Sequence, residues 1–280
     1  AMPFPMPFCL FGSSRASAAA DDDCFTYCYG GDWVQGKIGN YGLSFDGTGD
    51  ATSGQGYVVI NNSSDIPNGG SDGNLTVAAW ARFPPDTDDK WNTIISRTDN
   101  TTGEGWWLGK AGDTSIQSTN PSNRIGFRYE DTGGTYRYAY SNDASDAGVN
   151  NSTDWVHLVA VVTGTNPEAG LWINGTKQDV SATPGGAVGS SIPDSLVLGR
   201  YAADGGNYYA SCSIDEVAIW DVPLTDAQIS LLSTGSLTAD SITPPVKTAQ
   251  VDGSWTAGKV GSWALSTTSS NIGDTDTWGP

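Results

Sequence analysis

Residues 155–176 read WVHLVAVVTGTNPEAGLWINGT, two apolar runs joined by a polar connection. Both runs are rich in Val, Ile, Leu and Trp, and the first alternates in side-chain character, so they predict strands over 155–162 and 170–173. The dipeptide Asn174-Gly175 favours a tight hairpin turn, in which both central residues take positive φ. The stretch predicts antiparallel β-structure.

The same pattern of short apolar runs between Gly, Asn, Asp and Ser clusters extends over about residues 31–220. The other strands are predicted at 42–45, 57–60, 75–83, 91–97, 106–109, 125–129, 136–140, 195–198 and 213–220. One helix is predicted over Thr225–Leu232, with Thr225 and Gln228 forming a capping box and Gly235 after its end. There is no alternation of strands and helices, so the fold class is all-β, a two-sheet antiparallel sandwich with one short C-terminal helix.

Composition excludes several classes of function. The 280 residues include 31 acidic and 13 basic side chains, a formal net charge of −18. This balance disfavours nucleic acid as a partner, because phosphate binding needs clustered Lys and Arg. No apolar run is long enough to span a membrane. The eleven Trp residues argue against a disordered acidic chain.

Residues 1–29 form an extended, proline-broken apolar segment containing Phe4, Phe8 and Phe11. Its only basic residue, Arg15, follows the apolar part, which is unlike a secretory signal. We therefore predict an N-terminal docking arm. Cys24 and Cys28 in this segment either form a local disulfide or stay free thiols, and the sequence favours neither.

A repeat links the two ends of the chain. Residues 31–44 recur at 253–266 with seven of fourteen positions identical. The second copy lies in a tail over 237–280 and is too short to bury a core of its own. Its strand, with Trp255 and Trp263, is expected to pair with an edge of its own domain or of a neighbouring subunit.

Residues 30–236 resemble a laminin-G-like domain, a jelly roll of the concanavalin A-like lectin/glucanase type. The motifs that carry the resemblance stand in family order at 37–47, 75–80, 94–97, 155–161, 171–175, 198–200, 214–220 and 224–229. The resemblance implies two packed antiparallel sheets and a range of non-catalytic roles that includes glycan binding, adhesion and particle assembly. Fold alone does not choose among these roles.

The resemblance also implies a structural calcium ion near the loop after the first strand of the domain. Candidate ligands are Asp46, Asp50 and Asp215. Calcium takes six to eight oxygen ligands, and carbonyl groups of the glycine-rich loop around Gly47 and Gly49 can supplement carboxylates. The alternative is that these are solvated turn aspartates.

Tyr136, Tyr138 and Tyr140 occupy alternate positions of one predicted strand, so their rings line one face. Together with Trp107 they are candidates for a glycan-stacking platform, the alternative being an aromatic cluster that packs a sheet. Trp106 and Trp107 point to opposite faces, so at most one of them is expected in the core between the sheets.

Catalytic signatures are weak. Retaining glycoside hydrolysis needs two nearby carboxyl groups, but Asp215 and Glu216 are adjacent on a predicted strand and point to opposite faces. His157 is the only histidine and falls in an alternating strand, which favours a structural role. We therefore expect a protein that is not an enzyme.

These observations predict a non-enzymatic structural, decoration or adhesion protein of a virion or extracellular assembly, placed at the virion surface or outside the cell. The terminal segments would dock it, through homo-oligomerisation or onto a larger assembly such as a capsid or surface layer. The alternative is a carbohydrate-binding, lectin-like module, and a glycoside hydrolase is the third hypothesis.

Overall fold

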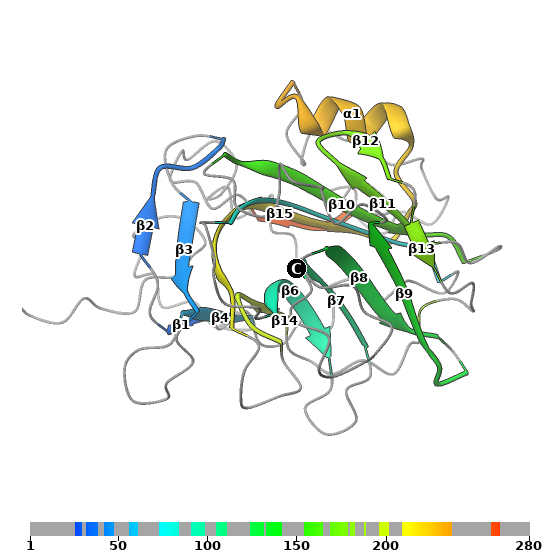
Figure 1. Ribbon diagram of the computed structural model, residues 1–280, viewed down its shortest axis with the longest axis horizontal. Coiled ribbons are helices and arrows are strands. Elements are labelled where there is room, and N and C mark those ends of the chain that lie inside the picture. Colours follow the sequence, from blue (N-terminus) through cyan, green and yellow to red (C-terminus); the bar gives the residue numbers. More distant parts are fainter. Residues whose placement is uncertain are drawn as a thin grey trace, which may run out of the picture.

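The computed structural model describes the chain over sixteen segments, and every structural statement below refers to these residues. The segments are 26–29, 32–38, 42–47, 56–60, 73–83, 91–98, 105–110, 124–131, 133–141, 154–164, 169–178, 180–182, 188, 196–201, 209–236 and 259–263. Two antiparallel sheets lie face to face, and a single helix covers one of them from outside (Figure 1). The expected all-β jelly-roll sandwich is confirmed.

The first sheet has the strand order β1-β4-β14-β6-β7-β8-β9-β13. Its strands are β1 (Thr26–Tyr29), β4 (Tyr57–Ile60), β14 (Leu196–Leu198), β6 (Asn92–Thr98), β7 (Gly105–Lys110), β8 (Ile125–Glu130), β9 (Tyr136–Ser141) and β13 (Val180–Ala182). Strands β6 to β9 follow one another as antiparallel neighbours, and they form the part of the sheet that carries the site described below.

The second sheet has the order β12-β11-β10-β5-β15-β3-β2, with β16 paired to β15 beside this path. Its strands are β12 (Thr176–Lys177), β11 (Ala169–Ile173), β10 (Val156–Val162), β5 (Leu75–Arg82), β15 (Ser211–Trp220), β3 (Gly42–Asp46), β2 (Asp32–Val34) and β16 (Lys259–Trp263). Strands β10, β5 and β15 lie at its centre.

The main core fills the space between the sheets. Alternate residues of the central strands point into it, such as Val77 of β5, Leu158 of β10 and Phe127 of β8, all of them fully buried. A second apolar cluster lies on the other face of the second sheet, where Trp220 and Ile229 pack between β15 and α1 (Asp226–Ser233). The helix α1 covers this face of the second sheet (Figure 1), because the apolar residues of α1 and of the sheet pack against each other there.

The local predictions around the hairpin and the helix are confirmed. Asn174 and Gly175 have φ of 50° and 78°, as the Asn-Gly turn between β11 and β12 requires. Thr225 is the N-cap of α1, and its side chain and that of Gln228 form the capping box. Local sequence chemistry was sufficient for both.

The structure adds one strand near each end of the chain, β1 in the predicted arm and β16 in the predicted tail. The predicted N-terminal arm ended at residue 29, but Thr26–Tyr29 forms β1 and pairs with β4, so the sheet begins inside that segment. The pairing of β1 with β4 is long-range, so no neighbouring stretch of sequence indicates it. The second copy of the repeat contributes β16, which pairs with β15 of the same chain.

Several predicted residues lie outside the described part of the chain: Phe4, Phe8, Phe11, Asp50, Trp255 and Cys24. For them the predictions made above stand as predictions. Cys212 is a free cysteine, completely buried, and burial raises the pKa of its thiol to about 12. It is therefore a packing residue of the core at neutral pH.

Truncation of a core side chain gives a direct measure of this packing. Leu158 is fully buried between the sheets and lies opposite Ala79 and Ile173 on the neighbouring strands. We expect Leu158→Ala to lower the free energy of unfolding by about 2–5 kcal/mol, because it leaves a cavity. Chemical denaturation measures this.

The matched control is Thr176→Ala in β12, where the side chain is exposed. Its expected effect is within about 0.5 kcal/mol. Equal effects of the two substitutions would contradict the assignment of Leu158 to the core.

Candidate functional site

The four residues predicted as a glycan platform lie on one face of the first sheet, the face turned away from the second sheet. Trp107 of β7, Arg128 of β8 and Tyr138 of β9 are opposite one another in the strand register and form a row across three strands. Their chain neighbours Trp106, Phe127 and Ala139 point the other way, into the main core. The row therefore belongs to the outer face.

Tyr140 is held in this face by a glycine. Gly126 of β8 lies opposite Tyr140, and a Cβ atom at Gly126 would fall 2.4 Å from Cε1 of the tyrosine ring. The ring thus lies over a strand position that has no side chain, and it meets Trp107 there. Both Tyr140 and Trp107 are buried, with exposed fractions of 2% and 3%.

Two further aromatic residues complete the group. Trp91 precedes β6, and its ring stands edge-on to that of Trp107 with a centroid separation of 4.9 Å. Tyr201 follows β14 and packs against the same group. We call the seven residues of this face the outer aromatic cluster: Trp91, Trp107, Arg128, Tyr136, Tyr138, Tyr140 and Tyr201.

Arg128 links the tyrosines of the cluster. Its guanidinium lies 4.4 Å from the ring centroid of Tyr136 and 5.3 Å from that of Tyr201, and it donates a hydrogen bond to the Tyr201 hydroxyl. Cation–π contacts of this kind are worth about 0.5–2 kcal/mol. They hold a positive charge among aromatic rings at the surface of a strongly acidic protein.

The hydroxyl groups of Tyr140 and Tyr201 stay protonated at physiological pH. Burial raises the pKa of Tyr140, and the nearby Arg128 only partly offsets this effect. Burial also raises the pKa of Tyr201, again opposed by Arg128. Neutral hydroxyl groups can donate as well as accept hydrogen bonds, which suits the recognition of polyhydroxylated ligands.

Five members of the cluster are half-buried: Trp91, Arg128, Tyr136, Tyr138 and Tyr201. The rings of Tyr138 and Tyr140 are 5.5 Å apart, so the buried ring supports the more exposed one. Such an arrangement presents rigid aromatic surface next to a cationic fork of hydrogen-bond donors. It can stack on an apolar face of a ligand and hydrogen-bond its polar rim.

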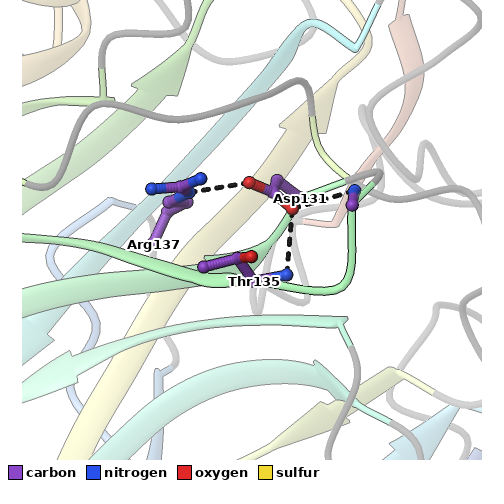
Figure 2. A network of polar contacts seen from close by, with 4 residues as sticks. Asp131, Thr135 and Arg137 are labelled. Carbon is purple, nitrogen blue, oxygen red and sulfur yellow. Dashed lines mark hydrogen bonds and ion pairs between the residues drawn. The ribbon is translucent and has the colours of Figure 1, made fainter.

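The turn between β8 and β9 fixes the position of the tyrosine strand. The carboxylate of Asp131 accepts hydrogen bonds from the backbone amides of Gly133 and Thr135, both at 2.9 Å, and pairs with Nε of Arg137 at 2.7 Å (Figure 2). Asp131 is 5% exposed, so these contacts compensate the burial of its charge. Arg137 is the second residue of β9 and lies between Tyr136 and Tyr138 in the sequence. The network therefore fixes the start of the strand that carries these tyrosines.

Sequence analysis identified the tyrosine ladder and Trp107 but not the rest of the cluster. Trp91, Arg128 and Tyr201 come from other parts of the chain, and only the strand register brings them to the same face. The available signal was Gly126, since a glycine inside a strand often marks the close approach of another group. The prediction that at most one of Trp106 and Trp107 enters the intersheet core is confirmed, although both rings are buried.

Of the three predicted calcium ligands, Asp46 and Asp215 are described, and they lie apart. Asp46 lies opposite Ser211 on β15, four positions from Asp215, which corresponds to about 13 Å along a strand. Asp46 is exposed, whereas Asp215 is fully buried. Two carboxylates at this separation cannot share one ion, so the expected calcium site stays a prediction that rests on the loop after β3.

Protein donors surround the carboxylate of Asp215. Its Oδ2 accepts hydrogen bonds from the backbone amides of Lys37 at 2.7 Å and Ile38 at 2.9 Å, and Oδ1 accepts one from the amide of Glu216 at 2.9 Å. Glu216 itself has a φ of 47°, in the left-handed region, where β15 makes a bulge. Asp215 thus ties the segment before β3 to the bulge of the central strand.

His157 lies opposite Trp80, and Trp80 in turn lies opposite Asp215, so the three residues form a row across β10, β5 and β15. Its ring contacts that of Trp80 at a centroid distance of 4.9 Å, and Nδ1 has no hydrogen-bond partner. Burial lowers the pKa of His157 to about 3, so the imidazole is neutral at physiological pH. This environment is that of a packing residue.

Within the described segments no group of three or more His, Cys, Asp or Glu side chains is arranged to hold a metal ion. No helix of that same part of the protein has the length and apolar character to cross a membrane.

With the fold and the cluster described, comparison with known proteins assigns the family. A family model described as the concanavalin A-like lectin/glucanases superfamily matches residues 52–230. This match covers more than half of the chain, and the chain therefore belongs to that superfamily. A search among curated proteins gave no match.

Several solved structures share the architecture. The binding domain of Paraclostridial Mosquitocidal Protein 1 aligns with a TM-score of 0.56 and 14% identity, covering 77% of this chain and 48% of that one. The binding domain of botulinum neurotoxin DC in complex with rat synaptotagmin II aligns with a TM-score of 0.54, 17% identity and coverages of 80% and 49%. The same binding domain in complex with SialylT gives 0.54, 16%, 80% and 48%.

At these identities the likeness shows the fold alone. This chain also spans only about half the length of those chains. What they bind is therefore a property of those proteins, and it bears on this chain only as a hypothesis.

The buried carboxyl of Asp215 predicts a specific pH dependence. Burial raises its pKa from 3.8 to about 6, although three backbone amides oppose the shift. Between pH 4 and 6 the folded state then holds a proton that the unfolded state releases, so the free energy of unfolding falls as the pH rises through this window. The fall attributable to Asp215 is at most about 3 kcal/mol.

Urea unfolding of the wild type and of Asp215→Asn at several pH values measures this contribution. The difference in unfolding free energy, wild type minus variant, should decrease between pH 4 and 6 and be flat above pH 7. Parallel curves for the two proteins would contradict the assignment.

Proposed function

We propose that this chain is a non-enzymatic binding and adhesion module that recognises a glycan through its outer aromatic cluster. The observation that carries the proposal is the combination of half-buried tyrosine rings, Tyr136 and Tyr138, with Arg128 on the outer face of the first sheet. Sugars present apolar C–H faces and a polar rim of hydroxyl groups, and this surface offers a partner for each.

Structural neighbours support a binding role. The solved structures described above are binding domains of toxins, and two of them are complexes, one with rat synaptotagmin II and one with SialylT. By analogy we place this module outside the cell or on a virion surface, where such recognition takes place. Fold-level analogy raises the expectation of binding but does not identify the ligand.

The cluster is built as a binding surface rather than as a catalytic one. Its members are aromatic or cationic. The nearest described carboxylates are that of Glu130, the last residue of β8 and the register partner of Tyr136, and that of Asp131, which follows it. The Asp131 carboxylate is engaged by Arg137 and two backbone amides. Glycoside hydrolysis needs a pair of carboxyl groups across the scissile bond, and the outer aromatic cluster offers none.

Substitution of one half-buried ring, that of Tyr138, tests the proposal. A glycan array with the wild-type protein selects ligands, and titration calorimetry then compares Tyr138→Ala with Tyr138→Phe. We expect Tyr138→Ala to raise the Kd about tenfold, a loss of ~1.4 kcal/mol, because stacking surface is lost. Tyr138→Phe keeps the ring and should bind nearly as well as the wild type.

The matched control is Leu231→Ala. Leu231 is an exposed apolar residue on α1, which covers the other sheet. The substitution Leu231→Ala should leave the Kd for the glycan unchanged. Glycan binding that is equally tight in Tyr138→Ala and wild type would move the site elsewhere, and the lack of saturable binding to any glycan would reject the proposal.

A further inference from the structure

A second arginine lies beside the outer aromatic cluster. Arg200 immediately precedes Tyr201, and its Nε donates a hydrogen bond to the carbonyl oxygen of Tyr201 at 3.3 Å. The carbonyl oxygen of Arg200 accepts a hydrogen bond at 2.8 Å from Oγ of Ser96, which lies opposite Trp107 in the register of β6 and β7. The backbone of Arg200 is therefore fixed against β6, next to the strand that carries Trp107.

Two tyrosine rings hold the guanidinium of Arg200. Its Cζ lies 4.5 Å from the ring centroid of Tyr57 and 5.7 Å from that of Tyr209, and the two ring centroids are 6.0 Å apart. Tyr57 is followed in β4 by Val58, which points into the main core, so the ring of Tyr57 belongs to the outer face of the first sheet. The guanidinium of Arg200 is thus placed on the same face as the outer aromatic cluster.

The hydrogen-bonding edge of Arg200, a half-buried residue, remains available. Among the described residues, no acceptor contacts either terminal nitrogen of the guanidinium, and no carboxylate pairs with it. Neither nitrogen is enclosed by the protein without a partner, so both are open to solvent. Aromatic rings contact the flat face of a guanidinium, whereas a carboxylate binds in its plane through two parallel N–H donors. The ring contacts therefore orient Arg200 without occupying the donors that an anion would use.

Tyr201 connects Arg200 to Arg128 of the cluster. The hydroxyl of Tyr201 accepts a hydrogen bond from Arg128, and its carbonyl oxygen accepts one from Arg200. The outer face of the first sheet thus carries two cations set among tyrosine rings, in a chain with 13 basic and 31 acidic residues. Repulsion of an anionic ligand by the net charge of −18 is screened beyond about 8 Å at physiological ionic strength, so the contacts within the site decide.

We propose that Arg200 selects a glycan that carries a carboxylate, such as a uronic acid unit, and binds this carboxylate through its two terminal nitrogens. The inference rests on the proposed function, because it names the class of glycan that the outer aromatic cluster recognises. The tyrosine rings supply stacking surface for the sugar, and Arg200 supplies a planar pair of donors for its acidic group. The module therefore discriminates acidic glycans from neutral ones.

Comparison of an acidic glycan with its own neutral ester tests the proposal on the wild-type protein. The probe is the tightest carboxylate-bearing ligand of the glycan array, measured by titration calorimetry as the sodium salt and as the methyl ester. We expect the ester to bind about 10- to 100-fold more weakly, because it lacks the charge-assisted hydrogen bonds. Equal Kd values for salt and ester, or an array that selects only neutral glycans, would overturn the role of Arg200.

Substitution of Arg200 locates the selectivity. In Arg200→Gln the Kd of the salt should rise about 10- to 100-fold, and salt and ester should bind alike. Arg200→Lys keeps the charge but lacks the planar fork, so its Kd should lie between those of the wild type and Arg200→Gln.

The matched control is Arg82→Gln, which removes the same charge from the other sheet. The guanidinium of Arg82 lies 5.1 Å from the ring centroid of Trp155, so this substitution also removes a cation from an aromatic ring. It should leave the Kd of the salt unchanged. Equal losses in Arg82→Gln and Arg200→Gln would assign the effect to net charge and overturn the inference.

The inference and the proposed function fail in different ways. If neutral glycans bind and Tyr138→Ala weakens them, while salt and ester bind alike, glycan recognition stands and the role of Arg200 falls. Binding through Arg200 of a sulfated glycan without carboxylates, in preference to the carboxylated probe, would overturn selection of a carboxylate. No saturable binding of any glycan would reject both proposals. If Arg200→Gln does not fold, as its Tm would show, the comparison of salt and ester on the wild type and on Arg200→Lys still decides.

Discussion

The pairing of β15 on both sides is the constraint on which the rest of the structure depends. Its first half is held between β5 and β3, and its second half between β5 and β16. The same strand supplies Ile214, Val217 and Ile219 to the core between the sheets and Trp220 to the cluster under α1. Both hydrophobic clusters are therefore aligned by one strand, and the helix is positioned by what that strand presents.

The bulge in β15 makes this double role possible. A regular strand would place Asp215, Val217 and Ile219 on one face, which would put a carboxylate in line with two core residues. The irregularity between Asp215 and Ala218, with Glu216 in the left-handed region, changes the phase of the strand. Asp215 then faces the amides of the segment before β3, and the apolar residues return to the core.

Local chemistry was enough to predict the elements but not this change of phase. The strand runs, the Asn-Gly hairpin and the Thr225 capping box all depend on neighbours in sequence, and the structure contains them as predicted. The bulge depends on a contact between Asp215 and Lys37, 178 positions apart, for which the sequence has no local signal. The pairing of β1 with β4 escaped prediction for the same reason.

The candidate site shows the same limit. The tyrosine ladder follows from period two, because alternate residues of a strand share a face. Arg128 joins it only through the register of β8 against β9, and Trp91 and Tyr201 only through the ends of β6 and β14. The face on which a residue lies can thus be predicted from the sequence of one strand. Which residues gather into a site on that face depends on how several strands pair.

The outer aromatic cluster and the pairing of the C-terminal strand lie on different sheets. The cluster belongs to β7, β8 and β9 of the first sheet, and β16 completes the edge of β15 in the second. A net charge of −18 makes copies of this chain repel one another at a distance, so assembly through undirected surface contact is disfavoured. The pairing of β16 with β15 is made within one chain by register-specific backbone hydrogen bonds, so the second sheet is completed without any contribution from the aromatic face of the first.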